Sequence, residues 1–403
     1  MPDAWTIRPK VPRATYRLQF HEHFRLCDAL TLVPYFAALG ISHIYASPLF
    51  KARAHSVHGY DVCDYGQLNP EIGTEAELEN FVNALHKRGI GLVVDIVPNH
   101  MGIGTQENSW WWDVLKNGRA SQFANHFDIN WEPSDPKLCG KILVPILGNT
   151  LENVFNKSEL NLRTEDGEFF LEYYEHEFPV ALKLIPKDFS IRNLLEQQHY
   201  VLAPFWEGDE KLNYRRFFAV STLAGIRVED EKVFDEVHAL LRKWIERGWI
   251  DGLRVDHPDG LREPKKYLER LRSLAPDLWI IVEKILQPKE DVPDDWPVQG
   301  TVGYDFLNQV NGLFIESNNK GALINFYSEF TGEPTDVGKA VREKKIIVLK
   351  TLFTTEVNRL VEMLAQIAAK HSAYQKFSSE QWREALIEFA ASFPVYRAYV
   401  RPE

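Results

Sequence analysis

The chain has 403 residues, which is long enough for one large domain with insertions or for two to three domains. Hydrophobic residues make up 45% and charged residues 26%, as in soluble globular proteins, and the net charge of −11 argues against a nucleic-acid partner. No apolar run approaches the roughly 18 residues that span a bilayer, and residues 1–13 lack the apolar core of a signal peptide, so we expect neither a membrane segment nor secretion.

The first hundred residues alternate between patterns typical of strands and of helices. Apolar side chains recur at helical spacing in 30–39 and again in 78–85. Thr74 and Glu77 form a capping-box pattern that predicts the start of the second helix. The last apolar run is nearly continuous, as in a parallel strand that is buried on both faces. The expected strands are 15–20, 42–49 and 90–97.

The rest of the chain begins with a long interruption of this alternation. From about 101 to 219 the sequence is rich in loops, turns and aromatic side chains. Strand and helix patterns then resume, and the tail from about 337 to 392 looks helical throughout. The expected elements in between are helices at 233–248 and 264–271 and strands at 250–256 and 279–283.

Repeated strand–helix units predict a parallel sheet with crossover helices. We therefore expect an α/β fold in the form of a partial (β/α)8 TIM-type barrel. About strands 1–5 are visible, with a large insertion after strand 3 and a helical C-terminal segment. The expected organisation is a first barrel part in 1–100, an inserted lid or substrate subdomain in 101–219, a second barrel part in 220–315 and a helical segment in 316–403.

Three acidic residues, Asp95, Asp256 and Glu283, stand at the ends of three predicted strands. Parallel barrel strands point their carboxyl ends to one face, so these residues should converge there. Adjacent strands lie roughly 4.8 Å apart, close to the roughly 5–5.5 Å that separates the two carboxyl groups of a retaining glycosidase. Arg254, two residues before Asp256, should face the same side and keep that carboxylate ionised. A lone acid at a strand end is usually a turn residue or a cap, but this combination favours a catalytic site.

These segments resemble known sequence motifs. Residues 95–100, 252–256 and Glu283 look like the first three of the four sequence regions of the α-amylase superfamily, and 59–62 resembles its sugar-platform segment. A wider ordered set resembles the maltooligosyltrehalose synthase family over nearly the whole chain. That set comprises 15–19, 58–62, 110–115, 127–131, 213–218, 303–306 and 393–397.

The resemblance implies a role for each matched residue. Asp256 would be the nucleophile and Glu283 the general acid/base, while Asp95 would support Arg254 or be purely structural. His100 would hydrogen-bond the sugar in the cleavage subsite, and Tyr60 would offer it a stacking face. The tryptophans of 110–112 cannot all face one way, so only one or two should line the sugar path. The further residues expected to bind substrate are His58, Asp61, Asn99, Trp110, Trp112, Arg215, His257 and Lys284.

The reaction implied by the resemblance is an isomerisation of maltooligosaccharides. It converts the terminal α-1,4 linkage to α,α-1,1 through a glycosyl-enzyme intermediate, while the released glucose turns over in a pocket that excludes water. The insertion is the natural lid of that pocket. The reaction needs no metal or cofactor. Asn99 occupies a position that helps to bind calcium in many amylases, but no convincing set of further ligands is visible.

The sequence also departs from the family. No Asp follows Asp336, so the third carboxylate of the superfamily is not found, and only about five of eight barrel strands are visible. We therefore expect a C-terminally truncated relative, with a second chain as one source of strands 6–8. The alternatives are an α-1,4-glucan hydrolase or glucanotransferase, and a non-catalytic remnant. The three cysteines form neither a disulfide framework nor a metal pattern, which favours the cytoplasm.

Overall fold

The computed structural model describes residues 11–104, 106–181 and 190–400. Within them, six parallel strands form one sheet in the order β1-β2-β5-β14-β15-β16. The α/β, TIM-barrel-like architecture predicted from the sequence is thereby confirmed, and the sheet contains one strand more than the five expected. The strands are β1 (Thr15–Leu18), β2 (His43–Ala46), β5 (Gly91–Ile96), β14 (Gly252–Val255), β15 (Trp279–Val282) and β16 (Gly300–Thr301).

The register of the sheet brings the carboxyl ends of its central strands level with one another. Arg254 of β14 stands beside Asp95 of β5, in a register that continues to Val255 and Ile96. The hydrogen bonds continue past the strand ends, because the Asp256 N–H donates to the Ile96 carbonyl and the Glu283 N–H to the Val255 carbonyl, both at 2.9 Å. The residues that follow β14 and β15 therefore emerge at one edge.

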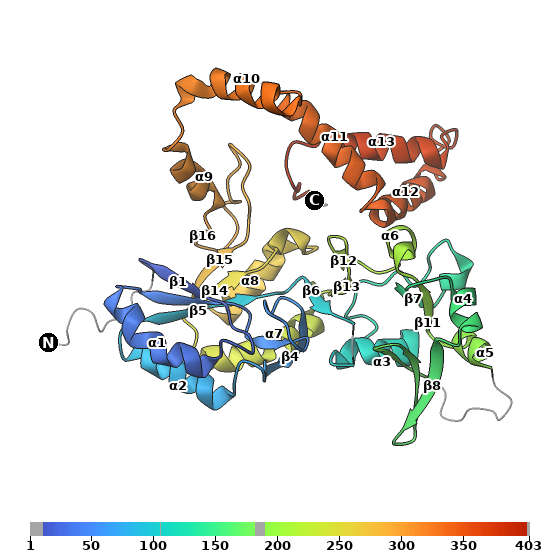
Figure 1. Cartoon of the computed structure of the whole chain (residues 1–403), viewed down its shortest axis with the longest axis horizontal. Helices are drawn as coiled ribbons and strands as arrows, with labels where there is room; N and C mark the ends of the chain where they lie inside the picture. The colour runs from blue at the N-terminus through green and yellow to red at the C-terminus, as the bar shows by residue number, and fades with distance from the viewer. Residues whose placement is uncertain (1–10, 105, 182–189, 401–403) are drawn as a thin grey trace.

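Four helices bury their apolar faces against this sheet, and Figure 1 shows α1 and α2 together on one side of it. The capping box of the second helix is present, since the Thr74 N–H donates to Glu77 at 2.7 Å and the Glu77 N–H to Thr74 Oγ1 at 3.3 Å. The helices are α1 (Leu26–Ala38), α2 (Glu75–His86), α7 (Glu231–Glu246) and α8 (Pro264–Leu274). A short antiparallel pair, β3 (Phe50–Ala52) and β4 (Val62–Leu68), follows β2.

The chain between β5 and α7 forms a second lobe of small sheets beside the main one (Figure 1). One of these sheets, β6-β13-β12, joins the two lobes, because β6 begins at His100 directly after the β5 turn. The strands are β6 (His100–Gly102), β7 (Ile142–Leu147), β8 (Leu160–Glu165), β9 (Glu168–Tyr173), β10 (His176–Pro179), β11 (Tyr200–Pro204), β12 (Arg216–Phe217) and β13 (Val220–Gly225). The helices are α3 (Ser109–Asn117), α4 (Leu151–Asn156), α5 (Ile191–Glu196) and α6 (Gly208–Lys211).

The C-terminal segment is helical, as predicted, and it arches over the rest of the chain in Figure 1. Its far end contacts the second lobe, where Glu356 accepts a hydrogen bond from Arg216 at 3.0 Å and Thr355 donates to the Gly208 carbonyl at 3.2 Å. The helices are α9 (Tyr304–Gly312), α10 (Lys320–Thr331), α11 (Val337–Lys350), α12 (Thr354–Ala368) and α13 (Ser379–Ser392). None of the helices in the described ranges combines the length and the apolar composition that crossing a bilayer requires.

Candidate active site

Arg254 gathers the three predicted acids at the carboxyl edge of the sheet. Its Nη1 donates to Asp95 Oδ1 at 2.9 Å and to Asp256 Oδ1 at 2.6 Å, and its Nη2 lies 3.0 Å from Glu283 Oε1. Both strand neighbours of β14 thus contribute a carboxylate to one guanidinium. The distance from Asp256 Oδ1 to Glu283 Oε1 therefore cannot exceed the sum of these two contact distances and the width of the Arg254 guanidinium. The sequence-derived expectation that the two carboxyl groups converge therefore agrees with this geometry.

Glu283 and Asp256 differ in how they meet solvent. The side chain of Glu283 is 23% exposed and that of Asp256 is 8% exposed. The second oxygen of Glu283, Oε2, accepts the backbone N–H of His257 at 3.0 Å. This bond depends on a left-handed backbone at His257, whose φ is +42°. The more accessible carboxyl group is the one better placed to exchange a proton with a bound molecule.

Burial dominates the ionisation of the nucleophile candidate. Desolvation and then the charge of Asp95 raise the pKa of Asp256 to about 8, against the lowering effect of Arg254. Burial likewise raises the pKa of Asp95 above its ordinary value, although Arg254 opposes this. Arg254 was expected to keep Asp256 ionised at neutral pH, but it does not fully offset the desolvation.

Two tyrosines complete the surroundings of Asp95. The hydroxyl of Tyr60 donates to Asp95 Oδ2 at 2.6 Å, and the hydroxyl of Tyr45 donates to the same atom at 2.8 Å. Arg17 Nη2 donates in turn to the Tyr60 hydroxyl at 3.0 Å. Asp95 is fully buried, so it acts on its neighbours and does not reach solvent. Sequence reasoning missed Arg17 and Tyr45, although both lie in predicted strands whose carboxyl ends point to this edge.

His100 and its neighbours form the wall beside Tyr60. The Nε2 of His100 lies 3.1 Å from the Tyr60 carbonyl, and its ring centroid is 4.4 Å from that of Phe217. Burial lowers the pKa of His100 to about 3, so the imidazole is neutral at ordinary pH. The Asn99 amide nitrogen lies 3.2 Å from His100 Nδ1, while its oxygen accepts a hydrogen bond from Arg215.

Two more predicted residues lie in the loop that carries Tyr60. The carboxylate of Asp61 accepts a hydrogen bond from Ser56 at 2.5 Å and lies 3.8 Å from His58 Nδ1. The ring of His58 stacks beside Tyr60, with centroids 6.1 Å apart. Gln19, in the turn after β1, donates to the Val57 carbonyl at 2.9 Å and so holds this loop against the edge of the sheet.

Three predicted binding residues are not brought to the carboxylates. The fully buried ammonium of Lys284 lies 2.8 Å from Glu290 and 3.3 Å from Asp259, and not in the cleft. Trp110 stacks on Phe123 at 5.6 Å, within the second lobe. Trp112 lines a small cavity of that lobe together with residues of 144–146 and 176–178. A sugar contact of these three side chains stays a prediction.

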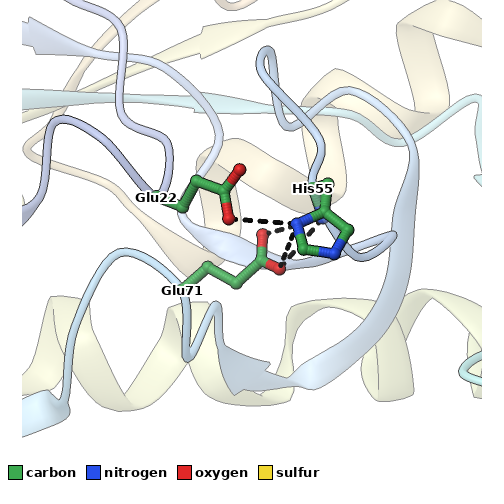
Figure 2. A group of neighbouring side chains, drawn as sticks. All are labelled: Glu22, His55 and Glu71. Atoms are coloured by element: carbon green, nitrogen blue, oxygen red, sulfur yellow. Dashed lines mark hydrogen bonds and ion pairs between the residues drawn. The ribbon is translucent and has the colours of Figure 1, made fainter.

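A further group of side chains fastens the loop that carries His58 and Tyr60. Figure 2 shows the carboxylates of Glu22 and Glu71 on the same side of His55, both turned toward it. Glu71 accepts the His55 backbone N–H with both oxygens, at 2.9 and 3.1 Å, and His55 Nδ1 lies 3.0 Å from Glu22 Oε2. The ligand atoms of all three residues lie within 4.8 Å of one another, and such carboxylate and imidazole groups can hold a divalent metal. Sequence reasoning missed this group because its members are far apart in the chain.

The sequence and the fold of the chain are similar to those of known proteins. Residues 30–273 match the α-amylase catalytic domain. The structure of maltooligosyltrehalose synthase from Arthrobacter ramosus superimposes with a TM-score of 0.87 at 40% identity, over 96% of this chain and 48% of that one. A Mycobacterium tuberculosis protein, described as an inferred maltooligosyl trehalose synthase, is 38% identical over 362 residues, 88% of this chain and 45% of its own length.

A relative of another activity matches a shorter stretch. The maltogenic α-amylase of Bacillus acidopullulyticus is 37% identical over 253 residues, which is 62% of this chain and 30% of that protein. The chain thus spans about half the length of the relatives that it matches over most of its own residues.

Proposed function

The chain belongs to the α-amylase catalytic-domain family, and on that premise we propose that it carries the retaining catalytic pair of an intramolecular transglucosylase. The reaction converts the reducing-end α-1,4 bond of a maltooligosaccharide to α,α-1,1, which leaves a trehalose end. The observation that carries this proposal is the binding of Asp256 and Glu283 by the two terminal nitrogens of Arg254. The similarity to maltooligosyltrehalose synthases over most of the chain supports the particular reaction.

In the reactive form of the site the proton lies on Glu283 and Asp256 is ionised, although burial raises the pKa of Asp256 to about 8. In the first step, Asp256 attacks the anomeric carbon on the non-reducing side of the terminal bond. Arg254 binds Oδ1, so we assign the attack to Oδ2. The bond from that carbon to the bridging oxygen breaks, and Glu283 gives its proton to the departing oxygen. Asp95, which accepts a hydrogen bond from the Tyr60 hydroxyl, holds Arg254 in place. The ring of Tyr60 would stack on the sugar. A hydrogen bond from His100 to the sugar would have to replace one of its present contacts, with the Tyr60 carbonyl or with Asn99.

In the second step, the released glucose turns and attacks through its anomeric hydroxyl. That hydroxyl gives its proton to Glu283 as the new bond forms, and the bond to Asp256 breaks. Water must be excluded between the two steps, because it would otherwise take the place of the sugar hydroxyl. We assign the exclusion of water to the second lobe, residues 101–219, which would act as the lid. The proposed organisation of the rest is two barrel parts, in 1–100 and 220–315, and a helical segment in 316–403.

We further propose that turnover needs barrel strands beyond those described, together with a third carboxylate. Among the described strands, β16 has a single neighbour and so offers an open edge for another strand. The matched relatives are about twice as long as this chain. A second polypeptide is one source of the remaining strands, which were predicted as 6–8 and number one fewer now that β16 is found in the sheet. The free cysteines Cys27, Cys63 and Cys139 favour a reducing compartment such as the cytoplasm.

Complementation tests this proposal. The chain would be co-expressed with the half of the Arthrobacter ramosus synthase that it does not match, and the complex incubated with maltopentaose. We expect reducing ends to disappear without release of free sugar. Asp256→Asn in the same complex should lower the rate by at least about a thousandfold while the complex still forms, because the covalent intermediate is lost. Retained turnover in that variant would overturn the assignment of the nucleophile.

The second candidate is an α-1,4-glucan hydrolase or glucanotransferase. The similarity to a maltogenic α-amylase over 62% of this chain favours it. The same incubation separates the two, because hydrolysis creates new reducing ends, transglucosylation between glucans conserves their number, and isomerisation removes them. A complex that forms without any turnover would favour the non-catalytic alternative.

A further inference from the structure

In this chain a side chain occupies the place where its fold family suggests a cation. The oxygen of Asn99 accepts a hydrogen bond from Arg215 Nη1 at 2.7 Å. The same guanidinium donates from Nη2 to the Ile226 carbonyl at 2.8 Å, from Nη1 to the Gly260 carbonyl at 3.3 Å and from Nε to Asp128 Oδ2 at 3.2 Å. Four oxygens from four segments, which we call the oxygen cage, therefore surround one positive group.

The backbone around the cage is shaped to this guanidinium. A Cβ added to Gly225 would lie 2.4 Å from Arg215 Cζ and 2.7 Å from its Nη2. A Cβ added to Gly260 would lie 2.5 Å from the Asn99 oxygen. Glycine at 225 leaves room for the planar group itself, and glycine at 260 leaves room for the Asn99 side chain that it binds. Arg215 therefore fills a fitted space and does not merely cover a surface.

We propose that Arg215 is the built-in cation of this cage and takes the place of a bound calcium ion. One carboxylate, one amide oxygen and two carbonyls are ligands suited to calcium. They are equally acceptors for the rigid fork of a guanidinium, which presents five donors and cannot lose its charge in a protein. With Arg215 in place, its hydrogen bonds occupy these oxygens, and its charge opposes that of Asp128 together with Arg359, whose Nη2 lies 3.3 Å from Asp128 Oδ1. This proposal gives Arg215 a positioning role, and its predicted contact with substrate stays a prediction.

The cage links loops that lead to the catalytic carboxylates. Asn99 precedes His100, and Gly260 ends η4 (Pro258–Gly260), which directly follows Asp256 and His257. Asp128 belongs to the second lobe, and Ile226 follows β13. Arg215 thus connects the loop after β5, the loop after β14 and the second lobe through a single group. It positions His100 and His257 without touching the reacting atoms.

Replacing Arg215 by alanine tests the proposal on the chain as it exists. Arg215 lines a cavity of about 540 Å³, so an added ion can reach the emptied cage. Arg215→Ala should lower the melting temperature by several degrees, and millimolar calcium should recover at least half of that loss. The wild-type melting temperature should not respond to calcium or to a chelator. Arg227, Arg262, Arg359 and Arg397 line the same cavity, so binding should be no tighter than millimolar.

Control variants separate the cage from other effects. Arg227→Ala removes an equal charge from the same cavity, where Arg227 pairs with Glu229, and should gain nothing from calcium. The calcium response of Arg215→Ala should vanish when Asp128→Asn is added. If Arg215→Ala is recovered only as aggregate, Arg215→Lys replaces it, because lysine keeps the charge but lacks the planar, multidentate guanidinium. Its melting temperature should lie below that of the wild type and should not respond to calcium.

Gly225→Ala gives an independent measurement, since its Cβ displaces the guanidinium while every cage oxygen remains. It should destabilise the wild type but add little to Arg215→Ala, because the group that it displaces is then absent. Gly321→Ala, at a helical position with nothing near the added Cβ, is its matched control. A wild type that calcium stabilises as much as it stabilises Arg215→Ala, an Arg215→Ala variant that calcium does not stabilise, or additive effects of Gly225→Ala and Arg215→Ala would each overturn the proposal.

Discussion

At the scale of single residues, burial of the nucleophile candidate sets the pH dependence of stability. The pKa of Asp256 is about 8 in the folded chain, against an ordinary value of 3.8. Between these values the native state holds a proton that the unfolded chain has released, so the contribution of this carboxyl to stability declines as the pH rises through that window. Asparagine cannot ionise and should avoid this loss.

Asp256→Asn should therefore stabilise the chain more at about pH 8.5 than at about pH 5, by on the order of 1–3 kcal/mol. Urea unfolding at both pH values measures the difference. Asp235→Asn, at a carboxyl group that is 66% exposed, is the control and should show no growing gain. An equal gain at both pH values would mean that Asp256 does not titrate in this window.

Residue patterns predicted the catalytic cluster in part. Asp95, Asp256 and Glu283 could be placed together because each ends a recognisable buried strand and parallel strands end at one edge. The hydroxyl of Tyr45 on Asp95 could not be predicted, because it depends on side-chain directions across two strands. The left-handed backbone of His257, which lets its N–H reach Glu283, is equally invisible in a sequence.

At the scale of elements, most strands of the main sheet were predicted from the sequence, whereas those of the second lobe were not. The parallel strands are apolar on both faces and stand out as continuous runs. The hairpin β8–β9 was missed although Asp166 and Gly167, both with positive φ, form a strong turn signal between its strands. Its strands carry exposed charged residues on one face, so the apolar run that revealed the buried strands is lacking.

The loop between β3 and β4 offers a prediction at this scale. Glu71 accepts the backbone N–H of His55, whose φ of +60° is uncommon for a residue with a side chain. Glu71→Ala should therefore increase hydrogen exchange across residues 53–60. Glu22→Gln removes only the partner of the imidazole and should change exchange much less. Equal acceleration in both variants would show that the ion pair, and not the backbone bond, holds the loop.

At the scale of the whole molecule, apolar side chains are unevenly exposed. Phe314 and Phe330, at either end of the segment that includes α10, are 84% and 80% exposed, whereas Phe81 under the main sheet is fully buried. A further cavity between α10 and α11 is lined mostly by apolar residues of both helices. An exposed surface of this kind marks an interaction site or causes association. The proposed requirement for additional strands gives this surface a natural cover.

The exposed apolar side chains of the C-terminal helical segment should accordingly make the chain self-associate when no partner supplies the additional strands. Replacing Phe314 and Phe330 together by serine should reduce association in light scattering while the melting temperature changes little, because these side chains are already in solvent. Phe81→Ser, by contrast, should destabilise the chain by about 3–5 kcal/mol, because it empties a packed core position. If the double variant associated as strongly as the wild type, the surface responsible for self-association would lie elsewhere. Pairing at the open edge of β16 would then be the better explanation of the association.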